Sequence, residues 1–116
     1  MKMILFVLHD ATKLPDLLNA WQEAGAGGAT VLLSTGMGRL SQANTLRDDL
    51  PLMPSLSAFY ERDENLSRTL FSVVKEAAVK RIAAATRRVV GDLDLPDTGL
   101  LVVLPVEHAE GLEKKR

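Results

Sequence analysis

The chain contains no cysteine and only two histidines among its 116 residues. The lack of cysteine excludes a disulfide framework and a thiolate zinc site, and two histidines are too few for a structural metal cluster. Aromatic residues make up only 4% of the chain, and the formal net charge is −1. Such a chain has neither a stacking platform for bases nor a broad positive field for phosphates. We therefore predict no metal site and no nucleic-acid partner.

Long hydrophobic runs are also lacking. The apolar run at residues 3–8 is too short for the core of a secretory signal, and no run approaches the ~18–20 residues of a membrane span. We expect a cytoplasmic protein without a cleaved leader and without a membrane span. A chain of this length can bury a core without metals or disulfides, so residues 1–116 are predicted to form a single domain.

The apolar patterns predict four strands and two helices. The strands are expected at residues 3–8, 29–35, 68–74 and 100–104, and the helices after Asp10 or Thr12 as far as Gly25, and from Glu76 to Val90. The order is therefore βαββαβ. With right-handed crossovers, this order gives an α+β, ferredoxin-like sandwich: a four-stranded antiparallel sheet with two helices on one face.

The second helix is predicted to be amphipathic. Its apolar side holds Val79, Ile82, Ala83, Thr86, Val89 and Val90, and its other side holds Lys80, Arg81, Arg87 and Arg88. We interpret the four cations as a solvated surface. The sheet face opposite the helices would expose leucine, valine and phenylalanine from the strands, which is unfavourable in water. We expect self-association to cover that face.

The connection at residues 36–65 is unusually long for two neighbouring strands. Loops beyond about 12–15 residues are uncommon in compact domains unless they are functional or disordered. This one opens with Gly36, Met37, Gly38 and Arg39 and continues into an apolar stretch that contains two prolines. We predict that it contacts a partner protein, or alternatively that it folds back on the protein's own surface. The predicted partner-binding residues are Leu50, Leu52, Met53, Phe59 and Tyr60.

Three segments, at residues 28–31, 36–39 and 99–107, occur in an order and spacing that resembles the PII nitrogen-regulatory signalling proteins. The resemblance implies a non-catalytic homotrimer that requires no cofactor. It also implies an adenine nucleotide effector (ATP, ADP, AMP or cyclic AMP) in the clefts between subunits. The long loop would then engage a target protein, such as a transporter or an enzyme, and a tail at residues 107–116 would follow the last strand.

The resemblance also implies roles for individual residues. Thr30 would lie beside the adenine, Gly38 would offer its backbone N–H to the phosphates, and Arg39 would bind phosphate oxygens with its guanidinium group. Glycine permits close approach of a phosphate, and a guanidinium binds oxygens in pairs, so these residue types suit those roles. The implied nucleotide-binding set is Thr30, Gly36, Gly38, Arg39, Thr98 and Gly99.

The sequence departs from the family on the phosphate side. Leu100 stands where classical members have a lysine, and Gly111 and Glu113 stand where they have paired arginines. The bend before the last strand carries Asp92, Asp94 and Asp97. These acids would repel a triphosphate unless a divalent cation such as Mg²⁺ lay between them. A nucleotide with fewer phosphates, or a cyclic nucleotide, is therefore an alternative effector.

Two other functions remain open at this stage. An acylphosphatase-like hydrolase or a small oxygenase would use the loop after the first strand, where His9 and Asp10 could form an acid–base pair. That loop has no glycine or arginine for phosphate, neighbouring strand residues point to opposite faces, and Asp10 is equally suited to cap a helix. A structural or metal-responsive trimer without a nucleotide role is the other alternative. We predict that the protein is not an enzyme.

Overall fold

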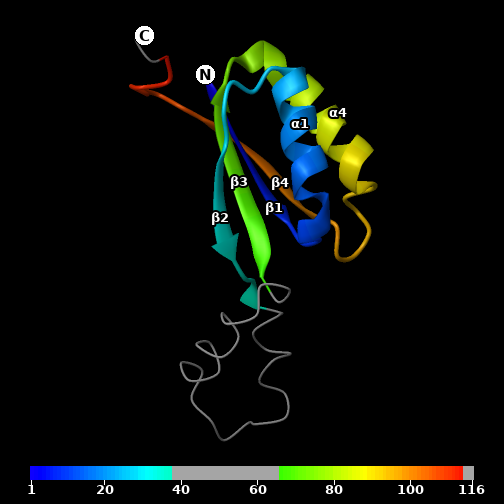
Figure 1. Ribbon diagram of the computed structural model, residues 1–116. Coiled ribbons are helices and arrows are strands. Elements are labelled where there is room, and N and C mark those ends of the chain that lie inside the picture. The colour runs from blue at the N-terminus through cyan, green and yellow to red at the C-terminus, as the bar shows by residue number, and fades with distance from the viewer. Residues whose placement is uncertain (38–65, 114–116) are drawn as a thin grey trace, which may run out of the picture.

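The computed structural model describes residues 1–37 and 66–113, and the predicted βαββαβ order is confirmed (Figure 1). The elements are β1 (Lys2–Leu8), η1 (Ala11–Lys13), α1 (Leu14–Ala24), β2 (Thr30–Ser34), β3 (Ser67–Val74), η3 (Glu76–Ala78), α4 (Val79–Val90) and β4 (Gly99–Pro105). Each strand lies within one or two residues of its predicted bounds. Within the described ranges, no helix is long and apolar enough to cross a bilayer.

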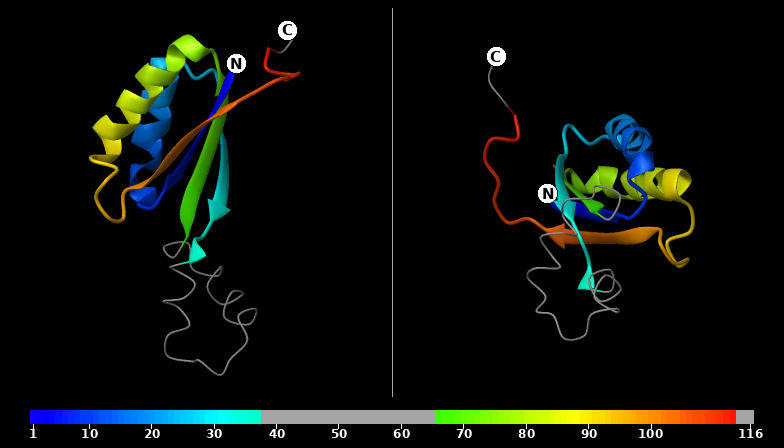
Figure 2. Two further views of the ribbon diagram at one scale, coloured as in Figure 1. Left: turned by 180° about the vertical axis from the view of Figure 1, so that it is seen from behind. Right: turned by 60° about the horizontal axis from the view of Figure 1, so that its bottom comes forward.

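The four strands form one antiparallel sheet in the order β2-β3-β1-β4. β1 and β3 are therefore central, and β2 and β4 are the edge strands. Helices α1 and α4 pack against each other on the same side of this sheet, and the opposite side carries neither (Figures 1 and 2). This is the ferredoxin-like arrangement that the sequence predicts.

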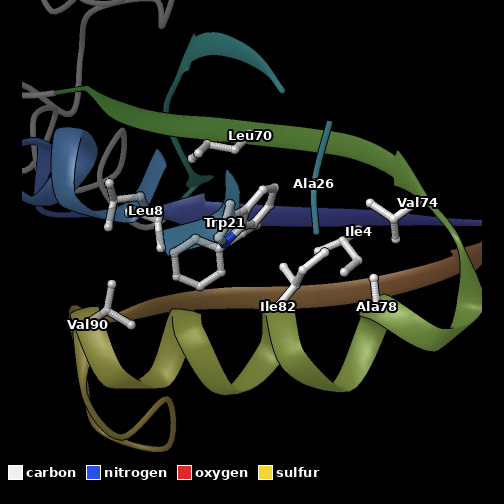
Figure 3. Close-up of a cluster of buried hydrophobic side chains, with 11 residues drawn as sticks. Ile4, Leu8, Trp21, Ala26, Leu70, Val74, Ala78, Ile82 and Val90 are labelled. Carbon is white, nitrogen blue, oxygen red and sulfur yellow. The ribbon is translucent and has the colours of Figure 1, made fainter. Parts of the chain in front are cut away.

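The core lies between the sheet and the helices. Ile4, Phe6 and Leu8 alternate along β1 and are fully buried, because every second side chain of a strand points to the same face. They meet residues of β3, α1 and α4 in one cluster, which is made up of Ile4, Phe6, Leu8, Leu17, Trp21, Ala26, Leu70, Val74, Ala78, Ile82 and Val90 (Figure 3).

A buried polar bridge joins the two helices inside this core. The indole Nε1 of Trp21 donates a hydrogen bond to Oγ1 of Thr86 at 2.8 Å. The same hydroxyl donates to the carbonyl oxygen of Ile82 at 2.8 Å, so its own proton is satisfied. Both side chains are almost completely buried, and burying these polar groups without partners would cost about 1–3 kcal/mol each. The bridge therefore fixes how α1 sits against α4.

The ends of the helices follow local chemistry. Asp10 accepts hydrogen bonds from the backbone N–H and the hydroxyl of Thr12, at 3.0 and 2.6 Å, and so begins the turn that leads into α1. Gly25 ends α1 in the left-handed conformation, with φ 118°. Arg81 of α4 donates to the carbonyl oxygen of Ala24, at the negative end of α1, at 3.2 Å.

The second helix differs from its predicted pattern at two residues. Ala83 is half-buried, as Val79 and Val89 are, and Ala85, which the predicted apolar side does not include, is buried. Arg81 is not only solvated: its guanidinium bonds α1, whereas Lys80, Arg87 and Arg88 are exposed as predicted.

Candidate functional site

One end of the sheet gathers most of the residues of interest. β1 and β2 end there, and β3 and β4 begin there, because β3 and β4 run antiparallel to β1. The chain therefore leaves the sheet at Ser34, returns at Ser67, and passes through Thr98 and Gly99 at the same end. The segment 36–65 joins the first two of these points. We call this end the loop end of the sheet.

Three hydroxyl groups hold β2 and β3 together at the loop end. The Oγ atom of Ser34 lies 2.9 Å from Oγ of Ser67 and 2.7 Å from Oγ1 of Thr69. Ser67 also donates to the carbonyl oxygen of Ser34 at 3.1 Å. If Thr69 donates to Ser34 and Ser34 donates to Ser67, every hydroxyl proton has an acceptor within the group. The trio, here called the hydroxyl clasp, therefore holds the end of β2 against the start of β3.

The bend before β4 is stabilised by its own residues. Asp92 accepts the backbone N–H of Asp94 through its side chain at 2.9 Å and the N–H of Leu95 through its carbonyl at 3.1 Å. The hydroxyl of Thr98 donates to the carbonyl oxygen of Leu95 at 2.8 Å. The hydroxyl proton of Thr98 is thus already committed, and Thr98 can offer a ligand only acceptor lone pairs or its backbone.

The charge of this bend opposes polyphosphate. The carboxylates of Asp92, Asp94 and Asp97 are all exposed, so they repel an approaching anion with a strength that falls as salt rises. Asp97 adopts a left-handed backbone conformation, with φ 63°, which aspartate tolerates better than most residues. In the described parts of the chain, no three acidic or histidine side chains are grouped closely enough to hold a metal ion.

The two predicted glycines differ in what the fold requires of them. At Gly99, with φ 150°, an added Cβ would lie 2.5 Å from Cζ of Phe6 and even closer to the carbonyl oxygen of Val7. Glycine is therefore needed there for β4 to pack on β1. At Gly36, an added Cβ would meet no atom within 4 Å. Packing therefore explains Gly99, whereas the structure gives Gly36 no packing role.

Within a single chain, the four described members of the predicted nucleotide set do not meet. Thr30 pairs with Phe71, about 13 Å along β2 from Ser34 and the loop end. Gly36 lies just beyond β2, at one edge of the sheet. Thr98 and Gly99 lie at the other edge, about 14 Å away across β3 and β1. Gly38, Arg39 and the predicted partner-binding residues Leu50, Leu52, Met53, Phe59 and Tyr60 lie outside the described residues.

The sheet side without helices is apolar, as the sequence predicts. Strand pairing places one set of large side chains on it from all four strands, and no charged residue of these strands shares it. We call this set the open face: Met3, Leu5, Val7, Leu32, Phe71, Val73, Leu100, Val102 and Leu104. Leu32, Leu100 and Leu104 are exposed, and the others are half-buried by their neighbours. A contiguous apolar surface of this kind marks an interaction site.

The pair of His9 and Asp10 does not form an acid–base couple. The hydrogen bonds that Thr12 donates, chiefly from its hydroxyl, lower the pKa of Asp10 and hold it as a carboxylate cap. Among the described residues, the buried atoms Nδ1 of His9 and Oγ1 of Thr35 have no hydrogen-bond partner. Both lie near the loop end; sequence reasoning considered His9 only as an acid–base candidate and did not single out Thr35. The capping alternative for Asp10 is the one the structure adopts.

Sequence reasoning also missed the hydroxyl clasp. Strand alternation places Ser67 and Thr69 on the same side of β3, but only the register with β2 brings Ser34 between them. Comparison with known proteins adds no further guide, because no protein-family model matches this chain and no curated protein matches it. The functional argument therefore depends on the residues and their geometry.

Proposed function

We propose that this protein is a non-catalytic regulator of the PII-like kind. It assembles into a homotrimer, binds an adenine nucleotide between neighbouring copies, and acts on a target protein through segment 36–65. The observation that carries the proposal is the open face together with the position of the loop end. A regulator of this type needs a surface for assembly and a long segment that can reach a partner, and this chain has an apolar open face and a long segment at the loop end.

The open face supports assembly. Water contact with its nine large apolar side chains is unfavourable by about 25 cal/mol for each Å² of apolar surface, and the face has no charge to oppose a second apolar surface. The simplest partner is another copy of this chain, and in a closed symmetric assembly the open face of every copy is covered in the same way. A trimer is the closed arrangement that the resemblance implies.

The separation of the predicted ligand residues supports a cleft between copies. Gly36 and Thr98 lie at opposite edges of one sheet, separated by the two central strands. We propose a ring in which the β2 edge of one copy lies beside the β4 edge of the next, a head-to-tail contact that repeats around the axis. Gly36 of one copy and Thr98 of its neighbour would then line the same cleft. Arg39 follows Gly36 by three residues in the sequence.

The acidic bend suggests which nucleotide is preferred. Asp92, Asp94 and Asp97 are exposed at the β4 side of the proposed cleft, and Leu100 supplies no positive charge there. Each added phosphate raises the repulsion from these carboxylates. We therefore propose that AMP or cyclic AMP binds more tightly than ATP in the absence of Mg²⁺, and that Mg²⁺ improves ATP binding by screening the carboxylates.

Calorimetric titration with ATP, ADP, AMP and cyclic AMP, each with and without Mg²⁺, tests this proposal. We expect saturable binding near one site per chain, weakened about tenfold or more by Arg39→Ala, because a lost guanidinium–phosphate contact costs about 1.5–3 kcal/mol. Lys80→Ala is the matched control, since Lys80 is an exposed cation at the far end of α4. Gly36→Ala should also weaken binding while leaving stability unchanged, because its Cβ meets open space.

Two results would overturn the nucleotide part of the proposal. One is the absence of heat with every nucleotide. The other is binding that Lys80→Ala weakens as much as Arg39→Ala does. An assembled protein that binds none of the four nucleotides would instead favour the structural trimer, with segment 36–65 acting as a partner-binding surface alone.

A further inference from the structure

The outer side of helix α4 is strongly cationic. We call its four exposed basic residues the cationic surface: Lys80, Arg81, Arg87 and Arg88. The twelve residues of α4 include no acid, and at 1.5 Å per residue the four cations span about 12 Å of the helix. Ile82 and Val90 lie on the other side of α4, in the core (Figure 3). The cationic surface therefore faces away from the sheet.

One of these cations contributes to the fold. The Nε atom of Arg81 donates a hydrogen bond to the carbonyl oxygen of Ala24 at 3.2 Å, so the contact between α4 and α1 explains its position. Within residues 1–37 and 66–113, no hydrogen bond or ion pair involves the side chains of Lys80, Arg87 or Arg88. In the described parts of the chain, three of the four charges are thus available to a partner.

The position of Lys80 is unfavourable for the helix itself. Lys80 is the second residue of α4, and the first turn of this helix has no acid. The N-terminal end of a helix carries a partial positive charge, so an acid is favourable there and a cation is not. Arg87 and Arg88 lie in the last turn, where cations are favourable. Helix stability therefore explains Arg87 and Arg88 but gives Lys80 no role.

The residue between the cations leaves their charge uncompensated. Ala84 is exposed, and it lies four residues after Lys80 and four residues before Arg88. A glutamate at this position would be able to pair with both cations on the helix surface and would stabilise the helix. A surface that is only solvated gains from such pairs, whereas a surface that binds an anion loses its charge through them. Alanine at position 84 therefore favours a binding role.

The surroundings of the cationic surface indicate which anion fits it. No large apolar side chain of α4 is exposed, so the helix has nothing to insert into a bilayer. A nucleic acid carries its phosphates well beyond the length of the helix. There it would meet the exposed carboxylates of Asp92, Asp94 and Asp97, in the bend that follows α4. A short acidic protein segment, by contrast, needs only the length of the helix.

A second copy of the chain is a poorer match, because α1, the helix beside α4, exposes only two carboxylates, from Asp16 and Glu23. We propose that the cationic surface binds an acidic segment of a partner protein, whose carboxylates meet Lys80, Arg87 and Arg88. An arginine binds a carboxylate with two parallel hydrogen bonds, which gives the contact a defined geometry. The helices and the open face lie on opposite sides of the sheet, so this inference does not depend on the proposed function (Figures 1 and 2).

Fluorescence anisotropy tests this contact with the full-length protein and a short labelled oligoglutamate peptide at low ionic strength. We expect saturable binding, which Ala84→Glu weakens about tenfold or more, because the added carboxylate pairs with the cations and repels the peptide. Ala84→Gln is the matched control, since it adds a side chain of the same size without charge, and it should leave the dissociation constant unchanged. The melting temperature of Ala84→Glu should equal or slightly exceed that of Ala84→Gln, which excludes unfolding as the cause of weaker binding.

Other results would overturn the inference. The absence of peptide binding, or equal losses with Ala84→Glu and Ala84→Gln, would show that the cationic surface does not bind acidic segments. Tighter binding to phosphatidylserine vesicles or to duplex RNA than to the peptide would overturn the choice of a protein partner. Sedimentation covers the remaining case: a mass that Ala84→Glu lowers and Ala84→Gln does not would assign the cationic surface to contacts between copies.

Discussion

Substitution of Gly99 by alanine gives the most stringent test of the packing at the loop end. The backbone of Gly99 has φ 150°, and its Cα lies so close to β1 that an added Cβ would be 2.5 Å from Cζ of Phe6 and 2.9 Å from Cε1. An L-residue in this conformation costs about 1–3 kcal/mol, and overpacking adds about 1–3 kcal/mol. We expect Gly99→Ala to lower the free energy of unfolding by about 2–6 kcal/mol.

Two other glycines separate these contributions. Gly91 also has a left-handed backbone, with φ 92°, but its Cβ would meet no atom within 4 Å, so Gly91→Ala should cost only the conformational part, about 1–3 kcal/mol. Gly27 has open space and no positive φ, so Gly27→Ala should be neutral or stabilise by up to about 1 kcal/mol. Phe6→Leu in the Gly99→Ala background should recover part of the loss, because it removes the aromatic edge.

Urea titration followed by the fluorescence of Trp21 measures all of these variants. Trp21 is the single tryptophan and lies in the core, so its emission reports unfolding of the sheet and helices together. The variants must be compared at one chain concentration, because the proposed assembly would add a concentration-dependent contribution to stability. Equal losses for Gly99→Ala and Gly91→Ala would refute the close approach of β4 to β1.

Three further substitutions test the helices. Thr86→Val should cost about 1–3 kcal/mol, measured by the same titration, because it leaves the buried indole N–H of Trp21 without an acceptor; Trp21→Phe in the same background should cost less than it does alone. Asp10→Ala should cost about 1 kcal/mol at neutral pH. Since the folded pKa of Asp10 is lowered, that stabilisation is present above its unfolded pKa near 3.8 and is lost as pH falls through the folded value, so the two proteins should converge in acid. Arg81→Met should lower the melting temperature slightly through the lost bond to the end of α1, whereas Lys80→Met should not.

The sequence was sufficient to predict the order of the elements and the faces of the sheet. Two local patterns predict buried faces correctly: the alternation of side chains in residues 3–8 and the helical spacing of Leu17 and Trp21. Both agree with the tertiary packing of the structure. The apolar character of the open face follows from the same alternation. Predicted boundaries differ by one or two residues because capping and 3-10 turns decide where a helix begins.

The details of the candidate site depend on register and contact, which a single sequence does not reveal. The hydroxyl clasp requires Ser34 to pair with Ser67, and the need for glycine at position 99 requires Phe6 to lie beneath it. The same limit applies to the predicted nucleotide set. The resemblance implied a site between subunits, and in one chain the fold distributes Thr30, Gly36 and Thr98 over both ends and both edges of the sheet. In the proposed assembly, the two edges of neighbouring copies would come together.

Sedimentation equilibrium of the unmodified protein tests the central claim most directly. The account predicts a mass three times that of the 12.6 kDa chain at micromolar concentrations, because in the proposed trimer neighbouring copies cover the open face and complete the site. A dimer would contradict the trimer but retain the open face as an interface. A protein that remains at the mass of one chain at all concentrations would contradict the claim that the functional site is built between copies.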